Sequence, residues 1–388
     1  MNSKVPILYV DIEGGWGGSS RSLYYAIKNI DRGRYEPVVI HGKRGPVERL
    51  YSEMGVPAYF FSPIPRTTAI PRNNLKSLAK FALELFHLPR FLAFAGRVAK
   101  RHKIRLIHLN HESLFFIAVF FRILFGRRLV MHVRTMLPKN VFGRLQVCMA
   151  RKTADHLIFI TENERDLWEG LCPAVKISPR TVMHNIYEQD GPVKKNGMLS
   201  GYGDRFKLAT LSTISYIRGI DRLVEVAGEL KKAGSDNVLF AVFGDDRPDN
   251  EYLNGIKRSI DERGLGRFFF FGGYQERPEP ALAECDALIH LSRESNPWGR
   301  NVIEAMINEK PVIAVGTYDK FVGNGENGYL LPAFDAAEVA GKIVHLSSRP
   351  DIVDEMGKAS GRKGKAYFDV SFNISKLEAV YESLTAGK

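Results

Sequence analysis

Cysteine is scarce in this chain of 388 residues, which contains only Cys148, Cys172 and Cys285. The number is odd and no two of them form a Cys-x-x-Cys pair, so the sequence offers neither a disulfide framework nor a zinc framework. We therefore expect reduced thiols, as in a cytoplasmic protein.

Long apolar runs are also missing. The longest, Leu114–Phe121, is far shorter than the ~20 residues that a membrane-spanning helix needs. The run Val5–Val10 is too short for a signal peptide and is typical of a first strand. We expect a cytoplasmic protein that does not cross a membrane. Two domains are expected, because the chain is too long for one ordinary core.

Acidic residues are rare in one part of the chain. Between Pro65 and Lys152 there are eighteen Lys or Arg residues and only two acidic ones, Glu84 and Glu112. One interpretation of this segment is a solvated basic face. The other is contact with anionic lipid headgroups, a phosphorylated acceptor or nucleic acid.

Within this basic segment, residues 75–103 have the apolar spacing of an amphipathic helix, and Pro89 is expected to break or kink it. Aromatic residues alternate there with Lys and Arg, a composition that suits a membrane interface. Core packing explains the same spacing, so both interpretations stay open at this point.

Short apolar runs alternate with helical segments along the chain, and one such unit carries the clearest site. Ala287–Leu291 reads as a buried strand, Ser292–Gly299 as a loop, and Asn301–Glu309 as a helix. The free N–H groups at such a helix start attract anions. Arg300 could pair with phosphate, and Glu304, one turn inside the helix, could accept hydrogen bonds from sugar hydroxyls. A structural turn with a solvated Arg is the alternative.

The identity and spacing of the residues in this stretch favour the functional interpretation. Pro297-Trp298-Gly299-Arg300, followed after three residues by Glu304, resembles the donor-site signature of glycosyltransferase family 4, a group 1 family of retaining enzymes. Residues 309–314 and 324–331 resemble the continuation of that signature. The resemblance implies an α/β GT-B fold, in which two Rossmann-like domains with parallel sheets face each other across a cleft.

The same resemblance implies a domain plan. Residues 1–186 are expected to form the N-terminal acceptor domain, 187–205 a linker and 206–370 the nucleotide-sugar donor domain. A last helix within 371–388 is expected to pack back on the first domain.

The resemblance also assigns roles to individual residues. Catalytic roles go to His132, Arg218 and Glu304. Acceptor-binding roles go to Arg21, His132 and Arg134. Donor-binding roles go to Gly17, Gly18, Arg218, Gly273, Tyr274, Asn296, Pro297, Trp298, Gly299, Arg300 and Glu304.

Three positions depart from the family pattern. Thr213 stands where the family usually has an Arg that binds diphosphate, and Ser20 where it often has a Glu. Asn296 stands where many members have a Glu. Either Asn296 binds the sugar as a neutral amide or Glu294 reaches in from two residues earlier.

The function that these observations imply is a retaining, metal-independent glycosyltransferase. Its donor would be a nucleotide-diphosphate sugar and its acceptor a glycan or a lipid-linked molecule, in the synthesis of cell-surface polysaccharide, lipopolysaccharide or glycolipid. No cofactor and no nucleic acid are expected. Peripheral contact with an anionic membrane through residues 65–152 is a further expectation. The alternatives are a non-enzymatic protein that binds polyanions or nucleic acid, and a nucleotide-sugar 2-epimerase of the GT-B fold.

Overall fold

A computed structural model describes residues 4–66, 75–173, 178–189, 193–245, 247, 249–293 and 299–386, with the side chains of all of these except 75–82. The chain folds as two compact units. The first is made of Met1–Glu188 together with Val370–Lys388, and the second of Gln189–Asp369.

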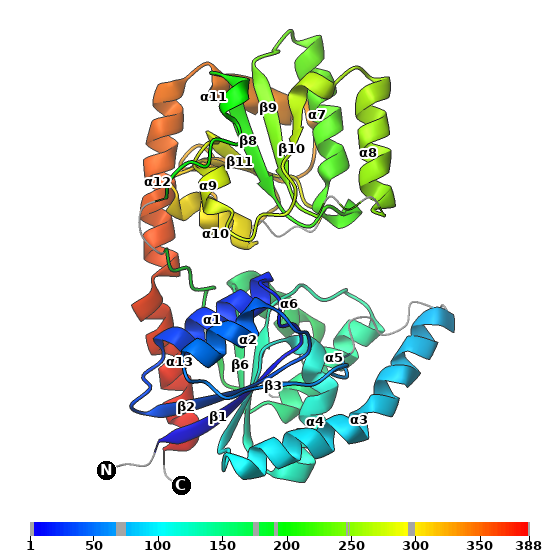
Figure 1. The fold of residues 1–388 in the computed structure, drawn as a ribbon, viewed down its shortest axis with the longest axis vertical. Helices are drawn as coiled ribbons and strands as arrows, with labels where there is room; N and C mark the ends of the chain where they lie inside the picture. Colours follow the sequence, from blue (N-terminus) through cyan, green and yellow to red (C-terminus); the bar gives the residue numbers. More distant parts are fainter. Residues whose placement is uncertain are drawn as a thin grey trace. The chain divides into compact units, whose positions relative to one another are not determined.

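The first unit contains a seven-stranded parallel sheet in the order β3-β2-β1-β4-β5-β6-β7 (Figure 1). Its strands are β1 (Val5–Asp11), β2 (Tyr35–His41), β3 (Ala58–Phe60), β4 (Leu106–Leu109), β5 (Arg128–Val133), β6 (His156–Phe159) and β7 (Arg180–Val182). Its helices are α1 (Gly18–Asn29), α2 (Pro46–Glu53), α3 (Leu75–Arg101), α4 (Phe115–Phe125), α5 (Val141–Thr153), α6 (Glu162–Leu171) and α13 (Val370–Thr385), with a 3-10 turn at Glu112–Leu114.

Both faces of this sheet are covered by helices, which explains why its strands read as continuous apolar runs. Successive side chains of a strand point to opposite faces. Leu8 and Val10 of β1 therefore belong to the core under α3, α4, α5 and α6, whereas Ile7 and Tyr9 belong to the core under α1, α2 and α13. The loops that follow the strands collect at the carboxyl edge of the sheet.

Helix α13, red in Figure 1, packs in the first unit although it is the last element of the chain. The hydroxyl of Tyr381 lies 2.5 Å from Nδ1 of His108 on β4 and 3.1 Å from the hydroxyl of Tyr9 on β1. The side-chain oxygen of Asn373 accepts a hydrogen bond from the backbone N–H of His184. These buried contacts attach helix α13 to the central strands of the sheet.

The second unit contains a six-stranded parallel sheet in the order β10-β9-β8-β11-β12-β13. Its strands are β8 (Phe206–Leu211), β9 (Val238–Phe243), β10 (Phe269–Phe271), β11 (Ala287–His290), β12 (Val312–Val315) and β13 (Gly328–Leu331). Its helices are α7 (Ile220–Lys232), α8 (Glu251–Glu262), α9 (Glu279–Leu282), α10 (Arg300–Ile307), α11 (Ala336–Ser347) and α12 (Pro350–Phe368), with 3-10 turns at Ser200–Tyr202, Tyr216–Arg218 and Gly266–Phe268.

The segment that precedes β8, the first strand of the second unit, is hydrogen-bonded to that unit. The carboxylate of Glu284 accepts hydrogen bonds from the backbone N–H groups of Met198 and Leu199, each at 3.0 Å. The second half of the segment 187–205 is therefore attached to the second unit.

Helix α10 is held in place by close packing against α12. A Cβ on Gly357 would lie 2.3 Å from the carbonyl oxygen of Glu309, and one on Gly364 would lie 3.1 Å from the Ile307 side chain. The side chain of Asn327, fully buried, donates a hydrogen bond to the Phe321 carbonyl and accepts one from the Gly323 N–H. These hydrogen bonds hold the loop between β12 and β13 together.

Helix α3 is continuous through Pro89, so of the two expected effects of this proline, a break or a kink, the break does not occur. A proline inside a helix costs about 3 kcal/mol, chiefly by removing one hydrogen bond and crowding the preceding turn. Pro89 itself is exposed, but Leu88 and Phe91 on either side are buried in the core, as is Ala95 one turn further. Burial on both sides of the proline holds the helix together.

The cysteines differ from the expectation that all three are reduced. Cys148 on α5 and Cys172 at the end of α6 form a disulfide, with their Cα atoms 5.9 Å apart, so the expectation of reduced thiols is wrong for this pair. The two residues are 24 positions apart and come together only because α5 and α6 pack side by side. Cys285 is free and buried. Of the helices that the structure describes, none combines the length and the apolar character needed to cross a membrane.

Candidate functional site

The carboxyl edge of the second sheet has the topology of a ligand site. β8 lies in the middle of the sheet, with β9 and β10 on one side and β11, β12 and β13 on the other. The loops after β8 and β11 therefore leave the sheet in opposite directions. In open parallel sheets, ligands bind in the crevice at such a switch point. The loop after β8 carries Arg218, and the loop after β11 leads to Gly299 and Arg300.

These two loops are fastened to each other. The backbone N–H of Arg293 donates to the carbonyl of Ile217 at 2.8 Å, and the hydroxyl of Ser292 donates to the same carbonyl at 3.1 Å. The guanidinium of Arg293 also pairs with both carboxylate oxygens of Asp221 at the start of α7, at 2.8 and 2.6 Å. Arg218, the next residue after Ile217, is thereby held close to the start of the β11 loop.

Gly219 makes this close approach possible. Its φ of +69° lies in the left-handed region, and a Cβ at this position would be 2.1 Å from the carbonyl oxygen of Leu291. A residue with a side chain would thus be strained and would collide with the end of β11. Gly219 is therefore required where the β8 loop turns into α7.

Replacing Gly219 with alanine is expected to lower the melting temperature of the protein. Strain of this kind costs about 1–3 kcal/mol, and the clash with Leu291 adds to it. Gly234→Ala is a matched control, because Gly234 has a φ of +67° but no atom within 4 Å of an added Cβ. Differential scanning fluorimetry of both variants measures the difference. Equal melting temperatures would contradict the packing role of Gly219.

The start of α10 has no side-chain cap, which leaves its first N–H groups for another partner. Gly299 caps this helix without a side-chain hydrogen bond, and the first turn contains no acidic residue. A Cβ on Gly299 would come within 2.4 Å of the side-chain oxygen of Asn301, whose amide nitrogen lies 3.0 Å from Nδ1 of His290. His290 and Asn301, both buried, thus join the end of β11 to the first turn of α10.

Arg300 and Glu304 form a buried pair on α10. Nε of Arg300 lies 3.6 Å from Oε1 of Glu304, and the two side chains are only 9% and 4% exposed. A carboxylate at this depth can accept hydrogen bonds from a hydroxyl that enters the site, and the guanidinium beside it stabilises its charge. The predicted residues Asn296, Pro297 and Trp298, and the alternative Glu294, lie outside the described residues.

Two further predicted donor residues lie at the same edge of the sheet. Gly273, with a φ of +65°, follows β10, and its carbonyl accepts a hydrogen bond from the N–H of Gly244 after β9. The next side chain, Tyr274, is 63% exposed. Thr213, after β8, is also exposed and brings no charge to this edge.

In the first unit, the predicted glycine loop lies between β1 and α1. Gly17 and Gly18 are exposed, and α1 begins without a side-chain cap or an acidic residue in its first turn. The backbone here is open to a ligand. Arg21, in contrast, is buried, with its guanidinium carbon 5.6 Å from the ring centre of Trp16, and Ser20 is fully buried.

His132, at the end of β5, is buried in a layer of histidines. Its ring stacks on that of His108 with the centroids 5.6 Å apart, and its Nδ1 lies 3.3 Å from Nη2 of Arg134. Burial, with the charge of Arg134, lowers the pKa of His132 well below its usual value and that of His108 to about 3. Both rings are therefore neutral near pH 7, so His132 can act as a hydrogen-bonding group and not as a cation.

Arg134 joins several loops at the carboxyl edge of the first sheet. Its Nε and Nη2 donate to the carbonyl and side-chain oxygens of Asn110 at 2.8 and 2.6 Å, and Nη1 donates to Asn185 at 2.9 Å. Its backbone N–H donates to the buried carboxylate of Glu112 at 2.8 Å. The amide nitrogen of Asn110 in turn donates to Asp11 at the end of β1. Arg134, predicted to bind the acceptor, is thus also a structural centre of this edge.

Four residues of these edges are not among the site residues predicted from the sequence: Asn110, Glu112, His108 and His290. The signal that could have found Asn110 and Glu112 is a polar residue close after an apolar strand, because the carboxyl ends of parallel strands face the ligand crevice. His108 and His290 lie inside short apolar runs, where a histidine is indistinguishable from one that only packs.

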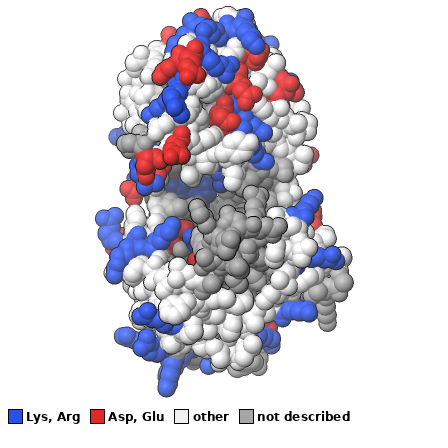
Figure 2. Space-filling view, turned by 90° about the vertical axis from the view of Figure 1, so that its right-hand side faces the viewer, with Lys and Arg blue, Asp and Glu red and all other residues white. Residues whose placement is uncertain are grey.

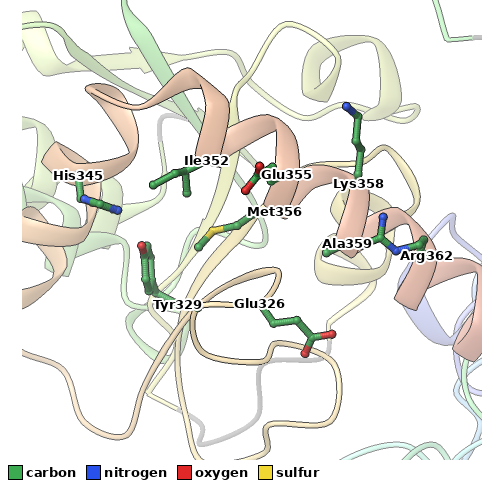
Figure 3. Close-up of a pocket in the computed structure, with 10 residues that line it drawn as sticks. Glu326, Tyr329, His345, Ile352, Glu355, Met356, Lys358, Ala359 and Arg362 are labelled. Carbon is green, nitrogen blue, oxygen red and sulfur yellow. The ribbon is translucent and has the colours of Figure 1, made fainter.

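The second unit also contains a cavity of about 620 Å³ (Figure 3). Tyr329 of β13, His345 of α11 and Met356 of α12 line it, together with Glu326 and Arg362. These residues surround the start of β13, and therefore the amino edge of the sheet. The cavity is separate from the site at the ends of β8 and β11.

No group of three or more His, Cys, Asp or Glu residues within the described parts of the chain is placed to hold a metal ion. Asp245, at the end of β9, is instead paired with Arg247 at 2.7 Å. Its neighbour Asp246 lies outside the described residues.

Comparison with known proteins agrees with this geometry. Residues 200–363 match the family described as glycosyl transferases group 1. A poly(ribitol-phosphate) alpha-N-acetylglucosaminyltransferase of Staphylococcus aureus is 30% identical over 179 residues, which are 45% of this chain and 35% of the relative. The alpha-D-kanosaminyltransferase of Streptomyces kanamyceticus is 24% identical over 264 residues, 64% of this chain and 67% of that protein. The matched part thus spans from about a third to two thirds of these relatives.

Among solved structures, Anabaena HepE in complex with UDP superposes with a TM-score of 0.78 at 21% identity, covering 98% of this chain and 100% of HepE. This likeness concerns the fold. The predicted α/β architecture, two Rossmann-like units with parallel sheets as in GT-B glycosyltransferases, is confirmed. The residues that match the group 1 glycosyl transferases all lie within the second unit.

Proposed function

We propose that this chain, whose second unit contains the residues that match the group 1 glycosyl transferases, transfers a sugar from a nucleotide-diphosphate sugar to a glycan or lipid-linked acceptor with retention of configuration. The observation that carries the proposal is the switch point between β8 and β11. There Arg218, the open start of α10 and the buried Glu304 lie at one edge of one sheet, inside the matched region.

The chemistry of transfer requires stabilisation of the leaving group. As the bond between sugar and diphosphate breaks, negative charge grows on the diphosphate, and preorganised positive groups lower the barrier. Arg218 and the N–H groups after Gly299 supply such groups without a metal ion. Glu304 accepts hydrogen bonds from hydroxyls of the donor. Tyr274 and Gly273 support the base at the end of β10.

The first unit supplies the acceptor side in this proposal. The exposed backbone of Gly17 and Gly18 is available to the acceptor. His132, which is neutral because it is buried, orients a hydroxyl through a hydrogen bond. Arg134 keeps the surrounding loops in place, and Arg21, stacked near Trp16, adds positive charge. The acceptor belongs to cell-surface polysaccharide, lipopolysaccharide or glycolipid synthesis.

The first test is thermal stabilisation of the purified protein by UDP, GDP and ADP and by their sugar conjugates, in buffer with EDTA. One nucleotide is expected to raise the melting temperature, because a ligand at 100 times its Kd stabilises the folded state by about 2.7 kcal/mol. The shift should survive EDTA, since cationic side chains replace a metal. The nucleotide that gives it identifies the base.

The outcomes against the proposal are equally clear. No shift with any nucleotide would mean that the edge formed by β8 and β11 is not a donor site, and that Thr213 and Asn296 mark its loss. Turnover of the donor to its C2 epimer without an acceptor would identify an epimerase instead. A product whose anomeric configuration is inverted, measured by proton NMR coupling, would contradict retention.

A further inference from the structure

The outer faces of three helices of the first unit expose large apolar side chains. Leu83 and Phe86 on α3 are 59% and 72% exposed, and Ile123 on α4 and Val141 on α5 are 72% and 77% exposed. The other exposed members are Leu124, Phe142 and Leu145. Of the eleven large apolar residues that are most exposed in the described chain, these seven lie between 83 and 145. Such clustering is typical of an interaction surface.

The three helices are neighbours on one face of the sheet. α4 packs against α3 on one side and against α5 on the other, and all three contribute to the same core. On α4 the outward apolar residues continue at helical spacing, because Phe116 and Phe120, half-buried with rings 5.3 Å apart, precede Ile123 and Leu124. We call the outer surface of α3, α4 and α5 the α3–α5 face.

The charges around these side chains are almost all positive. Eight basic residues on or beside the three helices are exposed and have no acidic partner within the described residues: Arg90, Arg97, Lys100, Arg101, Arg127, Lys139, Arg144 and Lys152. The two acidic residues of this region do not offset these charges. Glu112 is buried, and the carboxylate of Glu84 accepts a hydrogen bond from the backbone N–H of Arg66. In Figure 2 most charged side chains over the first unit are basic, whereas both signs mix over the second.

We propose that the α3–α5 face docks on the surface of an anionic lipid bilayer. A lipid bilayer is the partner that matches both the exposed apolar side chains and the positive charges of this face. Exposed apolar side chains can enter the boundary between headgroups and acyl chains, while Lys and Arg keep their charges at the headgroups. The positive charge adds attraction to anionic lipids. Nucleic acid would satisfy the cations but leave Phe86, Ile123 and Val141 in water.

This inference goes beyond the proposed function and is tested without activity. The full chain is mixed with vesicles of phosphatidylcholine alone or of phosphatidylcholine with phosphatidylglycerol, and the fraction that floats with the vesicles is measured. We expect binding to the anionic vesicles to be about tenfold or more stronger, and to fall with added salt.

Two variants separate the apolar and the charged contributions. The triple variant Phe86→Ser, Ile123→Ser and Val141→Ser is expected to weaken binding to anionic vesicles by about tenfold or more. Its control is Phe372→Ser on α13, which removes a side chain that is 52% exposed outside this face.

The charged variant reverses Arg97, Lys139 and Arg144 to Glu, and it is expected to abolish the preference for anionic vesicles. Its control reverses Lys232, Arg258 and Arg349, three exposed basic residues of the second unit, so that the net charge changes equally.

Three results would overturn the membrane assignment. Equal binding of all variants to anionic vesicles would show that the α3–α5 face is not involved. Binding to RNA or heparin that the serine variant leaves intact, without vesicle binding, would identify a polyanion surface. Self-association that the serine variant abolishes, again without vesicle binding, would identify a second copy of the chain as the partner. Far-UV circular dichroism checks that each variant is folded.

Discussion

Replacing Glu304 with alanine is expected to slow sugar transfer by about 10²–10³-fold, the range seen when one preorganised group is removed from a transition-state site. Glu304 is 3% exposed, lies one turn inside α10 and faces Arg300. Alanine removes the carboxylate that, in the proposed function, accepts hydrogen bonds from hydroxyls of the donor. It also leaves the Arg300 guanidinium without this neighbour, so the charge distribution at the diphosphate changes as well.

The measurement is the initial rate of product formation with the nucleotide sugar that the thermal test identifies. Glu304→Gln keeps the size and one acceptor oxygen, so it should retain more activity than alanine. Glu326→Ala serves as the control, because Glu326 pairs with Lys363 near the amino edge of the same sheet. Transfer by Glu304→Ala at the rate of the unaltered protein would remove Glu304 from the site.

A loss of activity must be separated from a loss of structure, because a buried ion pair is costly to break. The interaction here is confined to one helix, at 3.6 Å, and α10 is held independently by Gly357 and Gly364 of α12. We therefore expect the Glu304→Ala protein to keep its far-UV spectrum and a cooperative melting transition. A variant that melts before the assay temperature would be uninformative about catalysis, and the glutamine variant would then decide.

The fold was largely predictable from the sequence, because parallel strands that are buried on both faces consist of short runs of apolar residues. The strand predicted at Ala287–Leu291, for example, differs from β11 by one residue. Helix α8 was missed, although Leu253, Ile256 and Ile260 are buried at helical spacing. These three apolar residues are too few among their polar neighbours to indicate a helix from the sequence.

The candidate site was predictable only where its residues follow one another in the chain. Gly299, Arg300 and Glu304 belong to one loop and one helix, so their proximity is local. The partners of Arg134 are not local, since Asn110 and Asn185 lie 24 and 51 positions away. The same holds for the contact between Tyr381 and His108, 273 positions apart. Such contacts depend on the strand order of the sheet, which apolar spacing does not encode.

Replacing Arg218 with alanine is expected to weaken the binding of the nucleoside diphosphate by about 10- to 100-fold. Hydrogen bonds to charged groups contribute about 1.5–3 kcal/mol, and each 1.4 kcal/mol is about a factor of ten in Kd. Arg218 closes the 3-10 turn before Gly219, in the loop that Ser292 and Arg293 hold against β11. Because Thr213 brings no charge to this loop, the loss of Arg218 cannot be compensated from within it.

Isothermal titration with the nucleoside diphosphate measures this effect, with the free nucleoside as a second ligand. The nucleoside should bind the Arg218→Ala protein nearly as well as the unaltered protein, because it lacks the phosphates that Arg218 contacts. Arg218→Lys keeps the charge but loses the planar fork, so we expect an intermediate Kd. Arg258→Ala, which removes an exposed arginine from α8, controls for the change in net charge. An unchanged Kd for Arg218→Ala would assign the diphosphate to the start of α10 and Arg300 alone.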